Sequence, residues 1–303
     1  MTSDLSGTVV NLLKCGECGG EIERLNQYSL RCIECKKKIN FIDLDINIEI
    51  NQLSNHQKKQ IKFFSNEKIT SNNIYNLEPW QEEYMRRLTD TIDIYYGMNV
   101  VDIGSGSGYM AVELAKKGCN VVATDLSKRS VDRINRVAEK LNLASNLLAI
   151  NSLAEKLPLK DKSIDLIINN AVLEHIEDER LAISEMNRIA SAHSKIFLTV
   201  PIKYRYLNPL FLILNWVHDK KIGHLRRYDE KNIYMKFSNY GFTIIKNYYT
   251  GHTMKIIKIL INKIFKNTFS YKEIEINDRK KEDIKVFSSN IISILKKNEN
   301  TVL

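Results

Sequence analysis

The sequence contains no apolar run of the roughly 18 to 20 residues that a membrane-spanning helix requires. Its start also lacks the basic residues and apolar stretch of a secretion signal. At 303 residues, with 44% hydrophobic and 27% charged residues, the composition is that of a globular protein and excludes disorder as the main state. We therefore expect a soluble cytoplasmic protein with one full-sized domain and a small appendage.

Acidic residues are scarce in the last third of the chain. The formal net charge is −2 over residues 1–50, 0 over residues 51–200 and +11 over residues 201–303. A basic excess confined to one region favours an anionic partner there, such as RNA or a membrane surface. The alternative is a solvated lysine-rich face without a partner.

Cysteine is almost confined to the beginning of the chain, where Cys15, Cys18, Cys32 and Cys35 form two CxxC pairs separated by 13 residues. Each pair makes a tight knuckle that directs two sulfurs at one ion, and together the pairs supply four thiolates for a closed zinc site. Two disulfides are disfavoured without a secretion signal, and a redox pair would need only one CxxC. We predict a structural zinc ribbon over residues 1–50, closed by a strand over residues 36–46.

The rest of the chain alternates short apolar runs with helical patterns, after a polar linker or short helix over residues 51–75 and an amphipathic helix over residues 80–96. This alternation predicts an α/β fold with a doubly wound, mostly parallel, seven-stranded Rossmann-like sheet. We expect the seventh strand to pair antiparallel at the edge. The predicted strands are residues 99–103, 120–124, 147–150, 164–169, 195–200, 241–249 and 286–296.

A glycine-rich turn, DIGSGSG at residues 102–108, follows the first of these strands. Its glycines let the backbone pass close to a ligand at the electropositive start of a helix. Tyr109 stands where a nicotinamide-dinucleotide fingerprint has its third glycine, and the Gly-Lys-Ser/Thr ending of a phosphate loop is absent. Asp125 ends the second strand, where an acid can accept hydrogen bonds from two ribose hydroxyls of an adenosine.

With these features the chain resembles class I S-adenosylmethionine-dependent methyltransferases over residues 76–250. Residues 102–108 match that family's first motif and Asp125 its ribose-binding acid, while residues 157–165 and 169–176 resemble the segments around its fourth strand, including the "vlEH" of the quinone-biosynthesis branch. The resemblance implies S-adenosylmethionine as the methyl donor. The implied cofactor-binding residues are Asp102, Gly104, Ser105, Gly106, Gly108, Asp125, Leu126, Leu153 and Asn170.

One departure from the family concerns the adenine. An acid that often contacts the adenine amino group is replaced here by Ser152-Leu153-Ala154. We therefore expect the adenine to be read by backbone groups and by packing against Leu153.

The cysteine segment itself, over residues 10–50, resembles the small zinc-ribbon activator subunit that partners tRNA and release-factor methyltransferases. The resemblance is carried mainly by the cysteines, by Leu12-Leu13 before the first knuckle and by the strand predicted after the second. The methyltransferase domain then spans residues 76–303.

An acceptor-side insertion over residues 201–235 holds an apolar stretch, residues 207–217, that is either buried core, the lining for an apolar acceptor, or a lid. The GHLRRY sequence at residues 223–228 resembles a His-x-Arg-x-Tyr/Phe pattern of small-molecule methyltransferases. We predict His224 as a general base, the alternative being a hydrogen bond that stabilises a turn, and Arg226 or Arg227 as the holder of an anionic group.

A basic helix over residues 252–267 could be core or could lie on an anionic bilayer with its lysines outward. We expect methyl transfer to a small-molecule or lipid-linked acceptor at oxygen, with peripheral membrane contact. The alternatives are an RNA methyltransferase that binds through the ribbon and the basic third, and a non-catalytic S-adenosylmethionine-binding protein.

Overall fold

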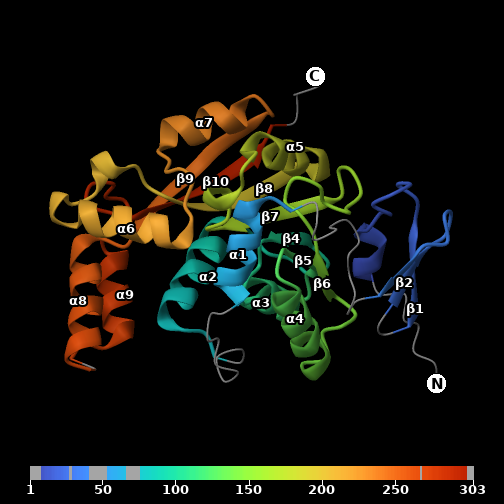
Figure 1. Ribbon diagram of the computed structural model, residues 1–303, viewed down its shortest axis with the longest axis horizontal. Helices are drawn as coiled ribbons and strands as arrows, with labels where there is room; N and C mark the ends of the chain where they lie inside the picture. Colours follow the sequence, from blue (N-terminus) through green and yellow to red (C-terminus); the bar gives the residue numbers. More distant parts are fainter. Residues whose placement is uncertain (1–7, 27–28, 41–52, 66–75, 267, 299–303) are drawn as a thin grey trace.

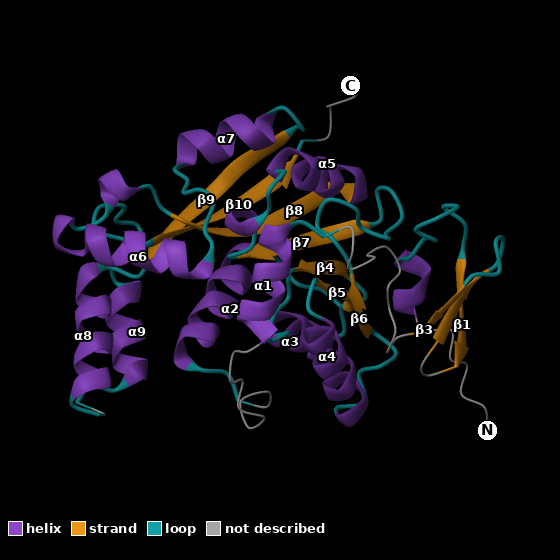
Figure 2. Cartoon of the chain, viewed as in Figure 1, coloured by secondary structure: helices purple, strands orange, loops and turns teal. Residues whose placement is uncertain are grey.

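The computed structural model describes residues 8–26, 29–40, 53–65, 76–266 and 268–298. A seven-stranded sheet lies at the centre, a three-stranded ribbon lies beside it, and helices cover both faces of the large sheet (Figure 1, Figure 2). Within these residues, no helix is long and apolar enough to cross a membrane. The strands are β1 (Ile22–Asn26), β2 (Ser29–Cys32), β3 (Lys38–Asn40), β4 (Asn99–Ile103), β5 (Asn120–Asp125), β6 (Leu147–Asn151), β7 (Ile164–Asn170), β8 (Ala190–Pro201), β9 (Phe242–Thr250) and β10 (Asn290–Lys297).

The large sheet has the order β6-β5-β4-β7-β8-β10-β9, and the first five of these strands run parallel. The parallel core and the antiparallel seventh strand were predicted correctly. The predicted edge position of the seventh strand is wrong, because β10 pairs antiparallel with both β8 and β9. Ile291, Ile292, Ile294 and Leu295 are all buried, so this strand is apolar on both faces and belongs inside the sheet.

Adjacent strand residues face two separate cores, as the period of two in a strand requires. Val100 belongs to the core that includes residues of α2, α3 and α4, whereas Val101 belongs to the other core, which includes residues of α5 and α7. The helices are α1 (Asn55–Ser65), α2 (Pro79–Thr91), α3 (Tyr109–Lys116), α4 (Lys128–Lys140), α5 (Glu179–Ile189), α6 (Leu212–Ile222), α7 (Glu230–Ser238), α8 (Thr253–Ile264) and α9 (Tyr271–Arg279).

The ribbon joins the larger domain by main-chain hydrogen bonds next to the β6 end of the sheet. The Lys14 N–H donates to the Pro158 carbonyl at 3.1 Å, and the Lys160 N–H donates to the Leu12 carbonyl at 2.9 Å. Apolar ribbon side chains, Leu13 among them, continue the core that contains α5 and α7. The predicted strand over residues 36–46 is present as β3, and its continuation past Asn40 lies outside the described residues.

Candidate functional site

The glycine-rich turn between β4 and α3 has the backbone that its sequence predicts. Gly104, Gly106 and Gly108 have φ angles of 66°, 52° and 80°, a region that other residues adopt at a cost. A Cβ atom on Gly104 would lie 2.5 Å from the Val172 side chain, and one on Gly108 would lie 2.5 Å from Ile134. A Cβ on Gly106 would meet only the Gly104 carbonyl at 3.9 Å, so this glycine leaves open space where a ligand can approach.

Asp125 ties this turn to the next strand. Its Oδ2 accepts a hydrogen bond from the Gly106 N–H at 2.8 Å, and its Oδ1 accepts one from the Ser127 N–H at 2.7 Å. Burial raises the pKa of Asp125. The carboxylate therefore positions the turn and keeps further lone pairs for a ligand.

Asp102 is the buried β4 residue with which the DIGSGSG segment begins. Burial, together with the charge of Asp125, raises the pKa of Asp102 to about 8. Its carboxyl group accepts a hydrogen bond from the backbone of Ala111 in the first turn of α3. Asp102 thus supports the start of that helix.

A cavity of about 550 Å³ opens above the turn, at the carboxyl ends of the parallel strands. This is where α/β sheets bind their ligands, and the volume suits a nucleoside-sized molecule. Asp102 and Leu153 do not line it, although the resemblance implied that they would. The implied cofactor-binding residues on its wall are Gly104, Ser105, Gly106, Gly108, Asp125, Leu126 and Asn170.

Other walls of the cavity come from residues that the sequence did not assign to the site. Trp80 lies with its ring centroid 5.5 Å from that of Tyr109, and together with Tyr84 these rings form an aromatic wall. Helix α1, within the predicted linker, contributes Gln60 and Phe64 among others. An amphipathic pattern indicates which residues are apolar, but not which cavity they face.

Glu155 also lines the cavity, three residues beyond Ser152, and burial raises the pKa of its carboxyl group. It follows directly on the segment in which the family's adenine-contacting acid is absent. A displaced acid is therefore available at this wall.

His175 and His224 lie together, with ring centroids 4.8 Å apart. His175 lines the cavity, and burial, aided by the neighbouring His224, lowers its pKa to about 3. His224 lies behind it and lines a second, more open cavity. Its Nδ1 is 2.9 Å from Oδ1 of Asp219, and its Nε2 is 3.6 Å from Oε1 of Glu174. His224, the predicted base, therefore does not line the main cavity. It contacts His175, which does.

The two arginines of the GHLRRY segment hold neighbouring protein groups. Arg227 donates to both carboxylate oxygens of Asp219, at 2.6 and 2.7 Å, and to the Ile202 carbonyl. Arg226 donates to main-chain carbonyls of the turn that carries Glu174. Both side chains line the second cavity. Their hydrogen bonds hold the acceptor-side loop in place, so the two guanidinium groups are not free to bind an anion in the bidentate manner.

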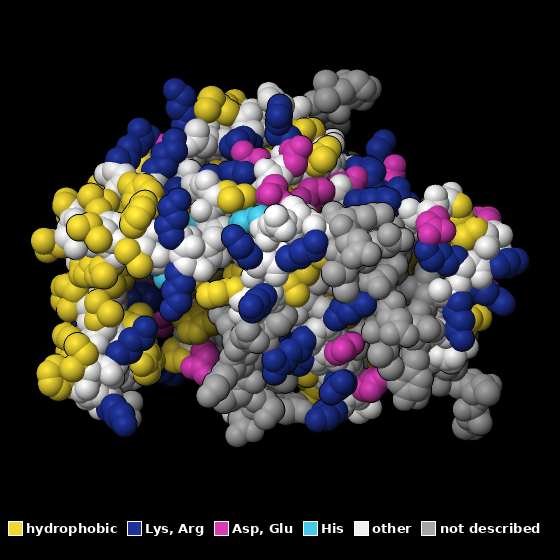
Figure 3. All heavy atoms as spheres, viewed as in Figure 1, with side chains coloured by type: hydrophobic (Ala, Val, Ile, Leu, Met, Phe, Trp, Pro, Cys, Tyr) yellow, Lys and Arg dark blue, Asp and Glu magenta, His cyan; other side chains and the backbone are white. Residues whose placement is uncertain are grey.

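Helix α8 has the opposite orientation to the one its lysines suggested. Lys255 pairs with Glu275 of α9 at 2.7 Å, and Asn262 bonds to the main chain of Phe269. The polar stripe thus faces α9, and the apolar side faces outward beside α6 (Figure 1, Figure 3). We give the name α6–α8 surface to the following exposed apolar side chains of these two helices and of the turns next to them: Leu210, Ile213, Leu214, Trp216, Val217, Met254, Leu260, Ile264 and Phe265.

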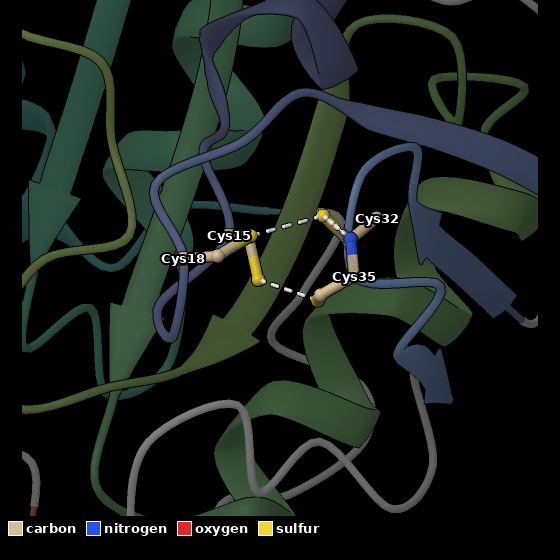
Figure 4. Close-up of side chains that lie close together, drawn as sticks. All are labelled: Cys15, Cys18, Cys32 and Cys35. Carbon is tan, nitrogen blue, oxygen red and sulfur yellow. Dashed lines mark hydrogen bonds between the residues drawn. The ribbon is translucent and has the colours of Figure 1, made fainter.

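The four ribbon cysteines converge from two loops (Figure 4). Sγ of Cys15 lies 3.7 Å from Sγ of Cys35, and Sγ of Cys18 lies 3.4 Å from Sγ of Cys32. All four sulfurs lie within 4.8 Å of one another. Bonds of about 2.3 Å to a tetrahedral zinc would place sulfurs about 3.8 Å apart, so the cluster is compatible with a zinc ribbon.

Comparison with known proteins agrees with this site. Residues 101–198 match the family described as methyltransferase domain, and the fold is shared with solved methyltransferases, among them one in complex with S-adenosyl-L-methionine (TM-score 0.57). The tRNA 5-carboxymethoxyuridine methyltransferase of Escherichia coli is 33% identical over 27% of this chain and 32% of its own length. The ubiquinone biosynthesis O-methyltransferase of Nitrosococcus oceani is 24% identical over 51% of this chain and 63% of its own length.

The chain thus spans less than two thirds of each of these relatives. Among solved structures, a chain of the complex between the Haloferax volcanii Trm112 methyltransferase activator and a methyltransferase aligns with 79% of this chain and 98% of its own length. The TM-score is 0.56 and the identity 14%, a likeness that shows the fold alone.

Proposed function

We propose that this protein transfers a methyl group from S-adenosylmethionine to oxygen of a small-molecule or lipid-linked acceptor. The observation that carries the proposal is the cavity that the glycine turn, Asp125 and Asn170 enclose within the methyltransferase domain. S-adenosylmethionine supplies an electrophilic methyl group on a sulfonium, so the protein needs mainly to position the two reactants. Positioning of this kind lowers a barrier by about 7 to 11 kcal/mol.

Different residues of the cavity would bind the ribose, the adenine and the acceptor. Asp125 and the backbone of Gly106 hold the ribose side, and Glu155 is placed to accept a hydrogen bond from the adenine. The aromatic wall of Trp80, Tyr84 and Tyr109 would cover one side of the bound donor. His175 on the cavity wall, kept neutral by burial, and His224 behind it are the candidate acceptors for the proton of an acceptor hydroxyl.

A lipid-linked acceptor is favoured by the α6–α8 surface. Leu210 is 83% exposed, Ile213 77% and Ile264 72%, an apolar patch that a soluble monomer rarely leaves uncovered. Trp216 of this surface also lines the second cavity together with His224. We propose that the patch inserts into an anionic bilayer, with exposed Lys263 and Lys266 beside the headgroups, which makes the protein peripheral to the cytoplasmic face of a membrane.

A second candidate is methylation of RNA. The relative from Escherichia coli is named as a tRNA methyltransferase, and the last third of the chain is basic. Several cations of that third are engaged within the protein, however, Lys255 with Glu275 and Arg227 with Asp219 among them. We therefore place this reading second.

We also propose that the four cysteines bind one structural zinc ion. A segment of about fifty residues buries little core, and metal binding of on the order of 10 kcal/mol supplies the missing stability. The hydrogen bonds of Lys14 and Lys160 would then connect a zinc-stabilised ribbon to the segment that follows Glu155.

The decisive experiment incubates the purified protein and methyl-labelled S-adenosylmethionine with a cell extract, which is then separated into lipid, RNA, protein and aqueous fractions. We expect label in the lipid or aqueous fraction and its loss with Asp125→Ala. Label confined to RNA would support the second candidate. Failure to label any fraction, with normal binding of S-adenosylmethionine, would support a non-catalytic binding protein.

A further inference from the structure

Three potential metal ligands meet where the cavity wall adjoins the acceptor-side loop. Glu174 and His175 lie on the short turn after β7, and His224 follows Gly223 at the end of α6. One ligand atom from each lies within 4.8 Å of the other two. The 3.6 Å between Nε2 of His224 and Oε1 of Glu174 is too long for a hydrogen bond, but it is close to the separation of about 3 to 3.5 Å between two ligands of one ion.

Hydrogen bonds orient both imidazoles for this purpose. Nδ1 of His224 contacts the carboxylate of Asp219 at 2.9 Å, and Nδ1 of His175 contacts the carbonyl of Gly223 at 3.3 Å. Because a carboxylate and a carbonyl can only accept, each Nδ1 carries a hydrogen, and in the neutral form of each ring the Nε2 keeps its lone pair. Carboxylate and carbonyl partners on the far nitrogen are the usual support of histidines that bind metals.

Asp219 also accepts hydrogen bonds from the hydroxyl of Tyr204 at 2.5 Å and from the guanidinium of Arg227 at 2.6 Å. These bonds hold the carboxylate against His224 and so fix the ring of His224 in place.

An unpartnered acceptor points to a missing cation. Glu174 is only 1% exposed, and its Oε2 has no hydrogen-bond partner within the described part of the chain. Oε1 of Gln60, on the wall of the same cavity, is also buried without a partner among those residues. A buried carboxylate oxygen without a donor is costly, and a bound cation would remove this cost.

We propose that Glu174, His175 and His224 bind a divalent transition-metal ion beside the main cavity, whose wall His175 forms, while His224 lines the second cavity. Two imidazoles and one carboxylate suit Zn²⁺, Mn²⁺, Fe²⁺ or Co²⁺, and three protein ligands leave positions open for an oxygen of the acceptor. Both histidines then serve as ligands rather than as proton acceptors, and the hydroxyl of an acceptor bound to the metal would lose its proton to water more readily. Metal binding can be measured without S-adenosylmethionine or acceptor, so failure of this proposal would leave the proposed methyl transfer standing.

The experiment titrates the full-length, zinc-loaded protein with Mn²⁺ and follows the free ion by electron paramagnetic resonance. Mn²⁺ is chosen because thiolates bind it poorly, so the ribbon does not compete. We expect one Mn²⁺ per chain, at least tenfold weaker binding in Glu174→Gln and His224→Gln, and binding weakened about 10- to 100-fold in Asp219→Asn. His218→Gln is the matched control, because its ring lies 6.1 Å from that of His224 and outside the cluster; its affinity should not change.

A readout on the unaltered protein avoids variants that fail to fold. Pulsed resonance of the bound Mn²⁺ should show coupling to imidazole nitrogen, because two of the ligands are histidines. Absence of this coupling would overturn the proposal, and so would failure to bind Mn²⁺, Co²⁺ or Zn²⁺ beyond the zinc of the ribbon at millimolar concentrations. Folded Glu174→Gln and His224→Gln proteins with unchanged affinity would equally refute it.

Discussion

Removing exposed apolar side chains from the α6–α8 surface should weaken binding to anionic vesicles without destabilising the protein. The variant we favour combines Leu210→Gln with Ile213→Gln, because these side chains are 83% and 77% exposed and contribute little to the core. Full burial of a Leu or Ile side chain is worth about 1.5 to 3 kcal/mol. Scaled by exposure, complete insertion would contribute about 1 to 2.5 kcal/mol for each residue.

Insertion of half of that surface would still contribute about 1.2 to 2.4 kcal/mol for the pair, and the partition coefficient should fall about tenfold or more. The lysines add a second, salt-dependent contribution of about 1 kcal/mol each near an anionic surface. Lys263 and Lys266 are exposed and should provide it, whereas Lys255 is paired with Glu275 and should not. Lys263→Gln with Lys266→Gln should therefore reduce binding at low salt and have less effect at high salt.

The assay is co-sedimentation with vesicles of phosphatidylcholine alone and of phosphatidylcholine mixed with phosphatidylserine. Tyr96→Gln with Leu181→Gln is the matched control, since these side chains are 88% and 54% exposed but lie on other parts of the molecule. We expect the control to bind as the wild type does. Equal binding by the Leu210→Gln, Ile213→Gln variant and the control, or no preference for anionic vesicles, would refute the assignment of this surface to a membrane. RNA binding by the same proteins, measured in parallel, tests the second candidate.

Three further predictions concern the cofactor, the metal of the ribbon and the pH dependence of stability. Asp125→Ala should weaken S-adenosylmethionine binding in calorimetry by at least about 1.5 kcal/mol, the value of one hydrogen bond to a charged group, while exposed Asp93→Ala should leave the affinity unchanged; equal affinities would contradict the assigned ribose site. Metal analysis of protein purified under reducing conditions should find zinc at the ribbon, and Cys15→Ser with Cys32→Ser should lose one zinc per chain; an unchanged content would exclude this site. The pKa of Asp102 is about 8 in the folded protein and about 4 in the unfolded protein. Between these pH values the folded state binds one more proton than the unfolded state, so the free energy of unfolding falls as the pH rises from about 4 to 8. Asp102→Asn should therefore gain stability relative to the wild type between pH 5 and pH 8 in urea unfolding without cofactor, and a constant difference would show that Asp102 does not titrate in that range.

Much of the fold and part of the site could be predicted because their signals are local. The spacing of Cys15, Cys18, Cys32 and Cys35 places four sulfurs around one point, which the structure shows. The alternation of apolar runs predicts the parallel strands, and the glycines at 104, 106 and 108 adopt the positive φ angles that a close-passing backbone needs. These features depend on neighbours within a few residues.

Other features depend on contacts between distant segments. The cavity takes one wall from α1, over a hundred residues from Asn170, and its histidine from a turn rather than from the GHLRRY segment. Spacing along the chain could not show that His175 stands in front of His224, because their order depends on how two loops pack.

The amino-acid sequence by itself determined the α/β class, the cysteine cluster and the glycine turn with its acid, since each is encoded by residue types at short spacing. Only the tertiary structure decided that β10 lies inside the sheet, where its two apolar faces are both covered. It also decided that α8 directs its polar stripe at α9 and its apolar side outward, because the partners of Lys255 and Asn262 belong to α9 and to the segment that precedes it. An amphipathic pattern specifies two faces of a helix, and the charge of the neighbouring helix selects which of them is buried.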